Sequence, residues 1–297
     1  MKFSIQISTK DRKDDLMRTL KCVSRLISDS VECIVFDDGS TDGTSDLIKE
    51  HFPQIIIRRN EVSKGYISCR NLMLNATNAE FVISLDDDSE FLCKSPLSAI
   101  EAHFNENPDC GLIAFRIFWG AMPPEIQRSD DYPQRVRGFV GCGHAWRMSA
   151  WREIPDYPEW YQFYGEEVFA AMQLFKKQIE VHYLPQVFVH HRVDMKKRGE
   201  DKADSVSRFS HSLRNDWNNF LIFYPMGKAV RKIGYSGWTQ LNTKVFNGRK
   251  ELFVPLLKVM KDTVVNVSRI RRNRNPLTDS QYDSFAKLPP AKIFWKP

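Results

Sequence analysis

The sequence predicts an α/β protein with a mostly parallel sheet that helices cover on both faces. From residue 3 to residue 119, short β-branched and aromatic runs alternate with helix-like segments, and this rhythm is typical of parallel βαβ units. Polar clusters at residues 8–12, 37–42 and 86–88 directly follow three of the predicted strands. Because ligands of such sheets bind at the carboxyl ends of the strands, the three clusters indicate a binding site.

The first half of the chain supplies the predicted sheet and its helices. Runs rich in Val, Ile and Phe predict strands at residues 3–8, 31–36, 55–57, 81–85 and 111–119. Helices are expected between them at residues 14–28, 41–52 and 67–78. The first has an apolar face made of Leu16, Leu20, Val23 and Ile27. Thr41 or Asp42 is the expected N-cap of the second, and Ser95 followed by Pro96 opens a fourth.

The pattern is less regular after residue 120. We expect a loop at 121–137, a Gly-punctuated strand at 138–146, a helix at 166–178 and a bent strand or strand pair at 181–190. The charged run at 192–204 predicts an exposed loop, and we expect the domain boundary there. A domain at residues 1–200 is then followed by a basic, mostly helical region at 201–297.

Composition is that of an ordinary globular protein, with 42% hydrophobic and 27% charged residues in a chain of 297. Nothing resembles a signal peptide and no apolar run reaches the length of a membrane span, so a cytoplasmic protein is expected. The six cysteines are scattered without a CxxC pair, which favours reduced core residues. The net charge of +6 is uneven, because residues 226–274 hold twelve Lys or Arg against two acids.

Three aspartates in a row, Asp86-Asp87-Asp88, directly follow the apolar run at 81–85. Side chains alternate along a strand, so Asp86 and Asp88 should point the same way and Asp87 the opposite way. Two converging carboxylates suit Mg²⁺ or Mn²⁺, especially when a diphosphate completes the coordination. A solvated acidic turn that caps the next helix is the alternative interpretation.

Five motifs in order resemble family 2 glycosyltransferases, which have the GT-A fold, and bacterial polysaccharide or rhamnosyl-type transferases in particular. The run at 37–44 resembles their DDGSxDxT signature, and Leu85 to Asp88 resembles their DXD motif. The other three are Gly65 with Cys69-Arg70-Asn71 for "G…ARN", Gly165-Glu166-Glu167 for "GED", and Pro185 to His190 for "P…V.H". The resemblance implies a Rossmann-like sheet flanked by helices, with a C-terminal helical extension.

The resemblance implies that a sugar moves from a nucleoside-diphosphate donor with inversion at the anomeric carbon. Asp88 would ligate Mn²⁺ or Mg²⁺, with His190 as a further metal or diphosphate contact. The donor would be bound by Thr9, Asp11, Asp38, Arg70, Asp86, Asp87, Gly143 and His144. Lys10 and Asp11 depart from the family's Tyr and Asn at these positions.

Glu167 matches the family's catalytic base, although it is a glutamate where the family has an aspartate, and Glu166 is the second candidate. Both carboxylates also suit the first turn of a helix, which is the structural alternative. Neighbouring helical residues diverge by about a hundred degrees, so one of the two should face the site.

Arg214-Asn215 and the following aromatic residues resemble a segment after the catalytic domain of bacterial polysaccharide glycosyltransferases. Residues 252–270 then predict an amphipathic helix with Phe253, Leu256, Leu257, Met260, Val264 and Val267 on one face. A basic amphipathic helix can lie on an anionic bilayer, here the inner face of the cytoplasmic membrane. Packing on the catalytic domain is the alternative, and no nucleic-acid module is recognisable.

We therefore expect a metal-dependent glycosyltransferase that uses a UDP- or dTDP-sugar and a glycan or lipid-linked acceptor. One alternative is a catalytically degenerate partner that binds nucleotide or glycan in a polysaccharide assembly complex. Another is a nucleotidyltransferase, which would need a Gly-rich triphosphate loop after the first strand; Ser8 to Arg12 contains no glycine.

Overall fold

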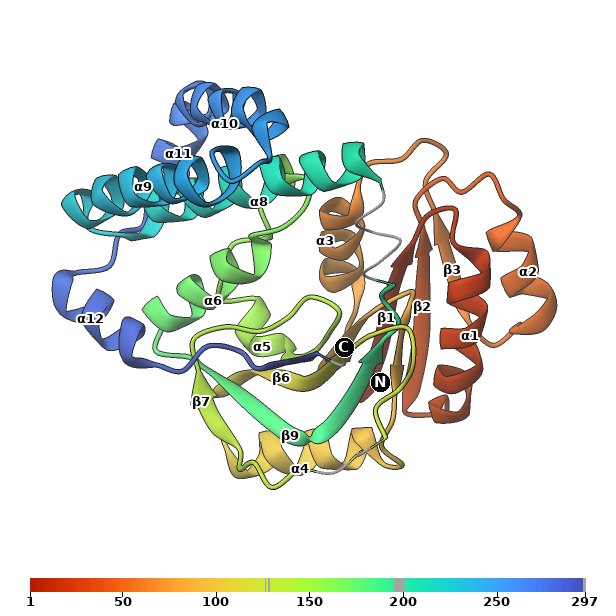
Figure 1. The fold of residues 1–297 in the computed structure, drawn as a ribbon. Coiled ribbons are helices and arrows are strands. Elements are labelled where there is room, and N and C mark those ends of the chain that lie inside the picture. The colour runs from red at the N-terminus through yellow and green to blue at the C-terminus, as the bar shows by residue number, and fades with distance from the viewer. Residues whose placement is uncertain (126, 128, 195–200, 296–297) are drawn as a thin grey trace.

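Four parallel strands form the N-terminal half of the sheet in the computed structural model, which describes residues 1–125, 127, 129–194 and 201–295. They are β1 (Phe3–Thr9), β2 (Val31–Asp37), β3 (Ile56–Arg59) and β4 (Phe81–Asp86), in the order β3-β2-β1-β4. The intervening helices are α1 (Lys13–Val23), α2 (Thr44–His51) and α3 (Tyr66–Ala76) (Figure 1). The parallel sheet predicted from the sequence is confirmed.

The second half of the sheet mixes strand directions. It continues from β4 through β8 (Gly143–Arg147), β6 (Cys110–Trp119), β9 (Glu180–His191) and β5 (Ser89–Phe91), with β7 (Gln134–Val136) also pairing β9. β8 runs antiparallel to both its neighbours, whereas β6 and β9 are parallel. The helices of this half are α4 (Pro96–Glu106), α5 (Met148–Trp151) and α6 (Glu166–Lys176), with a short 3-10 turn at Glu159–Tyr161. Another 3-10 turn, Ser24–Leu26, follows α1 in the first half.

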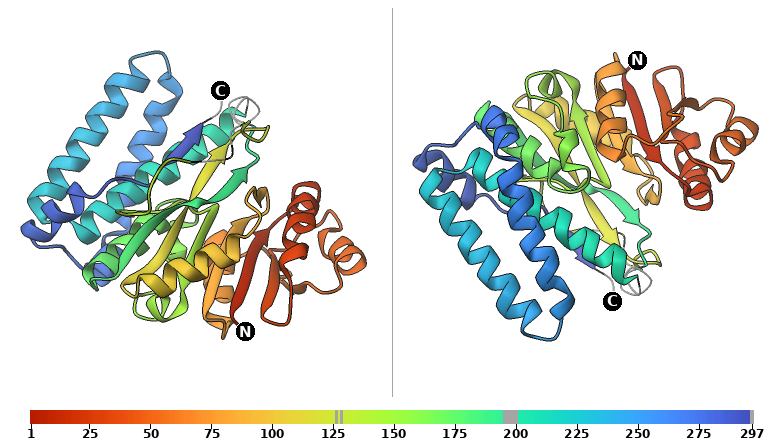
Figure 2. Two further views of the ribbon diagram at one scale, coloured as in Figure 1. Left: turned by 90° about the horizontal axis from the view of Figure 1, so that it is seen from below. Right: turned by 90° about the horizontal axis from the view of Figure 1, so that it is seen from above.

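Helices dominate the C-terminal region. They are α8 (Lys202–Phe223), α9 (Met226–Gln240), α10 (Phe253–Val265), α11 (Val267–Asn273) and α12 (Asp279–Lys287), with short π and 3-10 turns at Leu241–Val245 and Lys250–Leu252. The final strand β10 (Ile293–Trp295) returns to the sheet beside β6. Both views in Figure 2 show α9 and α10 projecting beyond the sheet, on the side away from α1 and α2.

Two hydrophobic clusters cover the two faces of the sheet because side chains alternate along each strand. Phe81, Ile83 and Leu85 of β4 point into the cluster that α1 and α4 cover, and Val82 points into the cluster that α3 and α6 cover. The second cluster also contains Phe223, Ile270 and other residues from the C-terminal helices. The region 201–297 therefore shares a core with the sheet, and the boundary at residue 200 stays a prediction.

Several element ends differ from the expectation. The helix expected at 14–28 ends at Val23, and the one expected at 41–52 begins at Thr44, after Gly43 in the left-handed conformation. Asp42 still accepts a hydrogen bond from the Thr44 backbone NH at 3.1 Å. The helix expected at 252–270 is two helices that meet at Asn266. Of the loop expected at 192–204, residues 195–200 lie outside the described residues.

Candidate active site

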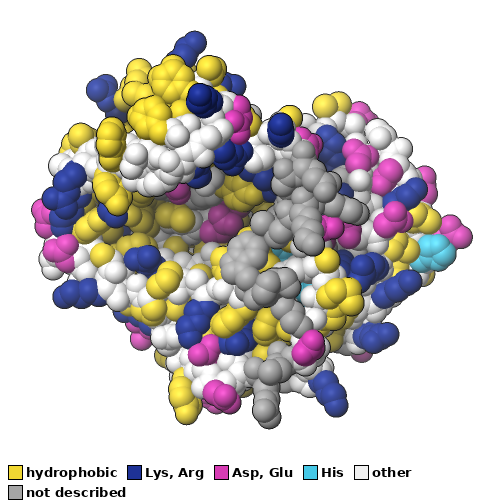
Figure 3. Space-filling view, in the orientation of Figure 1, with side chains coloured by type: hydrophobic (Ala, Val, Ile, Leu, Met, Phe, Trp, Pro, Cys, Tyr) yellow, Lys and Arg dark blue, Asp and Glu magenta, His cyan; other side chains and the backbone are white. Residues whose placement is uncertain are grey.

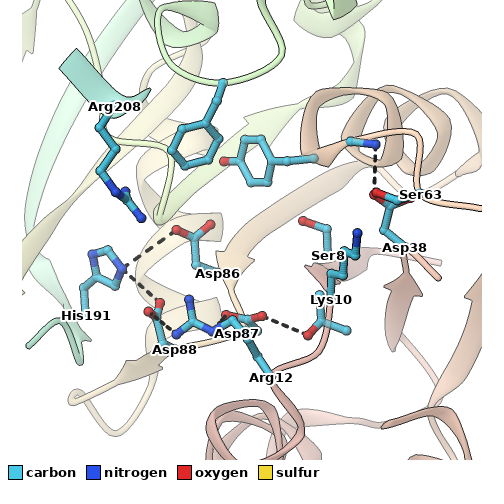
Figure 4. A pocket seen from close by; sticks show the side chains of 14 residues that line it. Ser8, Lys10, Arg12, Asp38, Ser63, Asp86, Asp87, Asp88, His191 and Arg208 are labelled. Atoms are coloured by element: carbon cyan, nitrogen blue, oxygen red, sulfur yellow. Dashed lines mark hydrogen bonds and ion pairs between the residues drawn. The ribbon is translucent and has the colours of Figure 1, made fainter. Parts of the chain in front are cut away.

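The carboxyl ends of β1, β2 and β4 lie side by side. In the strand register Ser8 pairs with Asp86, and Thr9 pairs with Asp37. Beyond these ends lies a cavity of about 310 Å³, which we call the donor cavity, with the acidic triplet on its wall (Figure 4). The sequence clusters expected to meet at this edge of the sheet therefore do meet.

Asp86 and Asp88 point toward His191, and Asp87 points away from it. His191 Nε2 lies 2.9 Å from Asp88 Oδ1 and 3.9 Å from Asp86 Oδ2. Asp87 instead accepts a hydrogen bond from Thr9 at 2.8 Å, and Figure 4 shows the two directions. The alternation expected from the sequence is found, although β4 ends at Asp86 and the other two aspartates lie in the turn before β5.

Arg12 pairs with the triplet from the loop after β1. Its Nη2 lies 2.7 Å from Asp88 Oδ2, and its Nε lies 3.4 Å from Asp87 Oδ1. Burial acts to raise the pKa of Asp88, but His191 and Arg12 outweigh it and hold that pKa well below its usual range. Burial raises the pKa of Asp87 to about 7 against the opposing effect of Arg12.

The donor atoms at this corner fit a divalent cation. One ligand atom each from Asp86, Asp88 and His191 lies within 4.8 Å of the others. Asp88 Oδ1 is buried and, apart from its ion pair with His191 Nε2, makes no hydrogen bond within the described part of the chain. Two carboxylates and an imidazole suit Mn²⁺ or Mg²⁺, so these residues could hold the metal.

His191, and not His190, faces the carboxylates. His190 directs Nε2 at the Gly120 carbonyl oxygen, 2.8 Å away, and Nδ1 at Glu90, 3.3 Å away. Neighbouring residues of a strand point to opposite faces, so His190 cannot reach the corner that His191 occupies. The prediction of His190 as a metal ligand does not fit this structure.

Arg70 lies behind the site. Its side chain is 3% exposed and donates to Asp86 Oδ1 at 2.7 Å, and its guanidinium lies over the Tyr66 ring. Within the described residues it is absent from the walls of the donor cavity. Arg70 was expected to contact the base or the diphosphate, but its helix turns it inward to Asp86, so it fixes that carboxylate.

Asp38 lines the donor cavity as expected, but its carboxylate is already engaged. It accepts hydrogen bonds from Asn60, Ser63 and the backbone NH groups of Lys64 and Gly65, at 2.6–2.9 Å. Although burial acts to raise it, these donors lower the pKa of Asp38 to about 2. Asp38 therefore holds the 63–65 loop against the cavity.

Asp11 points away from the cavity. It has a left-handed backbone with φ of 51°, and its carboxylate accepts from the backbone NH of Thr41 at 2.7 Å. It ties together the loops after β1 and β2 and, as far as the described chain goes, does not line the donor cavity. The predicted donor contact by Asp11 does not fit this placement, while Thr9 does line the cavity.

A second cavity, of about 280 Å³, adjoins the first and contains the two glutamates; we call it the acceptor-side cavity. Residues that line both cavities mark where they meet: Tyr66, Asp86, Phe163, His191 and Arg208. Figure 3 shows acidic side chains at the bottom of a hollow below α8.

Gly165 allows the turn that directs the glutamates. It adopts the left-handed conformation with φ of 87° immediately before α6, a backbone that glycine tolerates best. Burial raises the pKa of Glu167; burial, and then the charge of Glu167, raise that of Glu166. Glu166 is 2% exposed, and its Oε2 has no hydrogen-bond partner among the residues that the structure describes. Glu167 is the less buried of the pair.

Gly141 and Cys142 carry the glycine loop into the acceptor-side cavity. A Cβ at Gly141 would lie 2.7 Å from Glu167 Oε1, so only glycine allows this approach. Gly143 and His144 were expected beside the donor, but they are buried inside β8 and line neither cavity within the described residues. His144 packs instead on Phe139, with ring centroids 4.6 Å apart.

Several side chains at the site are not predicted from the sequence. Arg12 directly follows Asp11 and Tyr66 directly follows Gly65, so their positions next to predicted motif residues could have indicated them. Arg208 lies on α8 and donates to the Tyr164 hydroxyl at 2.7 Å. It comes from a helix 120 residues after the triplet, and no local signal marks it.

The mixed sheet, the acidic triplet after β4 and the adjoining glutamate pair are features of the GT-A fold. Residues 4–175 match the sequence profile described as glycosyl transferase family 2. The chain belongs to that family.

Sequence relatives match over part of their length. One is the UDP-Glc:alpha-D-GlcNAc-diphosphoundecaprenol beta-1,3-glucosyltransferase WfaP of Escherichia coli, 31% identical over 35% of this chain and 41% of that protein. Another is an uncharacterized glycosyltransferase of Haemophilus influenzae, 29% identical over 35% of this chain and 36% of the relative. The alignments thus span well under half of these relatives.

Solved structures share the fold over most of the chain. TarS 1-349 of S. aureus, in complex with UDP-GlcNAc, has a TM-score of 0.61 at 16% identity, covering 92% of this chain and 84% of TarS 1-349. GalNAc-T7 with UDP, GalNAc and Mn²⁺ has a TM-score of 0.63 at 14% identity, and the match covers 91% of this chain and 57% of the GalNAc-T7 chain. The mannosyltransferase PcManGT of Pyrobaculum calidifontis, with GDP-Man and Mn²⁺, has a TM-score of 0.57 at 13% identity. The match covers 96% of this chain and 78% of the PcManGT chain.

Proposed function

We propose that the protein transfers a sugar from a UDP- or dTDP-sugar to a hydroxyl group of a glycan or lipid-linked acceptor, with inversion at the anomeric carbon. The observation that carries this proposal is the junction of the two cavities at Asp86 and His191. A diphosphate in the donor cavity and a hydroxyl beside Glu167 would face each other across that junction. The bound UDP-GlcNAc of TarS and the diphosphoundecaprenol acceptor in the name of WfaP support these substrate classes.

Asp86, Asp88 and His191 would hold Mn²⁺ or Mg²⁺, which would supply positive charge to the leaving diphosphate. The Mn²⁺ in the structures of GalNAc-T7 and PcManGT, which share this fold, supports a metal-dependent activity. Arg12 keeps Asp88 Oδ2 occupied and leaves Oδ1 for the ion. Arg12 and Lys10 also line the donor cavity, so both add positive charge where diphosphate oxygens would lie.

Glu167 would act as the general base. It takes the proton of the acceptor hydroxyl while that oxygen forms a bond to the anomeric carbon, and the bond from this carbon to the diphosphate oxygen breaks. Attack from the side opposite the leaving group inverts the configuration. Glu166 is the weaker candidate because it is the more buried of the pair and is therefore less accessible to an acceptor hydroxyl.

A thermal-shift panel with nucleoside diphosphates and their sugars, with and without Mn²⁺, tests the donor class. Binding to the folded state raises the unfolding temperature by mass action. We expect UDP or dTDP to raise it, and more so with Mn²⁺ present. An unchanged unfolding temperature with every nucleotide in the presence of metal contradicts the proposal. Anomeric NMR signals of the transfer product then decide between inversion and retention.

The α10 surface supports a bilayer as a further partner. Phe253, Val254, Leu257, Val264 and Val265 are 45–72% exposed, whereas Leu256 packs against α8. Lys258 and Lys261 lie on the same helix, and Figure 3 shows a hydrophobic cluster over α10 with basic side chains nearby. Apolar residues among lysines complement an anionic lipid surface.

Membrane contact of this kind would be peripheral. Within the described residues, no helix combines the length and apolar character that a membrane crossing requires. We propose that the α10 surface rests on the inner face of the cytoplasmic membrane, where a lipid-linked acceptor would reach the acceptor-side cavity.

A further inference from the structure

Three side chains that bind transition metals meet at the edge of the sheet away from the active site. His103 comes from α4, Cys110 opens β6, and His182 lies in β9. One nitrogen from each histidine ring and the Cys110 sulfur all lie within 4.8 Å of one another. His103 Nε2 and His182 Nδ1 are 2.9 Å apart.

This cluster is remote from the two cavities. β6 runs from Cys110 to Trp119, whose ring centroid lies 5.3 Å from that of His191. A strand rises about 3.3 Å per residue, so Cys110 lies about 30 Å along β6 from Trp119, the residue beside His191. None of the three residues is among those that line either cavity in the described part of the chain.

An acidic side chain fixes the orientation of the His182 ring. His182 Nε2 lies 2.7 Å from Glu180 Oε2, and Glu180 Oε1 lies 2.7 Å from Arg135 Nη1. The carboxylate favours the tautomer with its proton on Nε2, which leaves the Nδ1 lone pair facing His103 and Cys110. A carboxylate on the outer nitrogen is the usual support of a metal-binding histidine.

The chemistry of these donors selects the ion. His103 directs Nε2 at His182 Nδ1, so each ring turns one nitrogen into the cluster. Two imidazole nitrogens and a cysteine sulfur suit Zn²⁺, whereas Mg²⁺ and Mn²⁺ prefer oxygen ligands. Both His103 and Cys110 are buried, which protects such a site from exchange with solvent.

We propose that His103, Cys110 and His182 bind a Zn²⁺ ion that ties α4 to β6 and β9. On binding, the Cys110 S–H bond breaks and its proton passes to solvent, while the sulfur and one nitrogen from each ring donate electron pairs to the ion. The His103 proton moves from Nε2 to the other ring nitrogen, and the hydrogen bond between the two rings is lost. A water molecule completes the tetrahedral coordination.

Cobalt substitution tests this site in the Asp88→Asn variant, whose change at the acidic triplet removes a competing ligand. We expect a thiolate-to-cobalt charge-transfer band in the near ultraviolet and, with Zn²⁺, one ion per chain that dialysis against Mg²⁺ does not remove. Zn²⁺ should also raise the unfolding temperature of this variant. Adding Cys110→Ser should remove the band and the shift, while Cys33→Ser, an equally buried cysteine in β2, should leave both.

Absence of the charge-transfer band from the cobalt-loaded Asp88→Asn protein overturns the proposal without any further variant. A band that persists in Cys110→Ser and disappears in Cys33→Ser also overturns it. If Cys110→Ser does not fold, His103→Gln replaces it, and its cobalt affinity should fall at least tenfold. Unchanged affinity in His103→Gln contradicts the proposed ligand set.

Discussion

The Arg70 guanidinium lies 2.7 Å from the Asp86 carboxylate, and this ion pair stands directly behind the junction of the two cavities. Arg70 is 3% exposed, and Asp86 is 26% exposed. A buried guanidinium cannot lose its charge, so its carboxylate partner is needed for folding as well as for any substrate contact.

Asp86→Ala should destabilise the protein by about 3 kcal/mol, because it leaves the Arg70 charge buried without its partner. Urea denaturation measures the change in the free energy of unfolding. Asp46→Ala is the control, since Asp46 pairs with Lys49 on the exposed face of α2 and such pairs contribute about 1 kcal/mol or less. Equal destabilisation by the two substitutions contradicts this role for Arg70.

Asp88→Asn should lower kcat by about a hundredfold or more, since a bound metal contributes several kcal/mol of transition-state stabilisation. EDTA should abolish wild-type transfer, and added Mn²⁺ should restore it. Asp15→Asn is the matched control: Asp15 also accepts from Arg12, at 3.0 Å, but does not belong to the group of possible metal ligands. Full activity of Asp88→Asn in EDTA would rule out the metal role.

Glu167→Gln should lower kcat by about 10²–10⁴-fold, because it removes the proton acceptor and keeps the size of the side chain. Donor affinity, measured by calorimetry with UDP, should not change. Glu166→Gln distinguishes the two candidates and should retain most of the activity. If Glu166→Gln loses turnover and Glu167→Gln keeps it, the base has been assigned to the wrong neighbour. If the wild type binds UDP but transfers no sugar, the result favours the alternative of a catalytically degenerate binding partner.

The pH dependence of kcat/KM should have an acid limb at a higher pH than an ordinary glutamate gives. A base must be deprotonated to accept a proton, and burial raises the pKa of Glu167. Activity is therefore present above that raised pKa and falls as the pH drops through it. If the residual activity of Glu167→Gln still falls at the same acid pH, the titrating group is not Glu167, and Asp87, whose pKa is about 7, is assigned instead.

The sequence predicted the sheet and the meeting of its polar strand ends because these follow from local alternation and from general rules of parallel sheets. Asp86 and Asp88 turn to one side because side chains alternate, which is a local property. His190 is predicted from its match to the "P…V.H" motif, whereas the histidine that faces the carboxylates is decided by strand register. β9 shifts register against β6 between Phe115 and Arg116, and no single sequence reveals such a shift.

The direction in which a side chain points is harder to predict on helices and loops than on strands. Arg70 lies on a helix whose inward face depends on how it packs, and Asp11 takes a left-handed backbone that depends on Thr41 and Ser40 in a distant loop. Arg208 reaches the site only because α8 packs against the α6 region. These placements come from tertiary packing, which periodicity does not encode.

Replacing Lys258 and Lys261 by glutamine should weaken binding to anionic vesicles about thirtyfold, since each lysine near such a surface contributes about 1 kcal/mol. Vesicle sedimentation with phosphatidylserine measures this affinity, and neutral phosphatidylcholine vesicles should bind the wild type weakly. The double variant Lys21→Gln, Lys49→Gln is the control, because Lys21 lies on α1 and Lys49 lies on α2, and both helices are far from α10. If vesicles do not bind and Val254→Glu instead disrupts a concentration-dependent dimer in sedimentation velocity, a second copy of the chain covers the α10 surface.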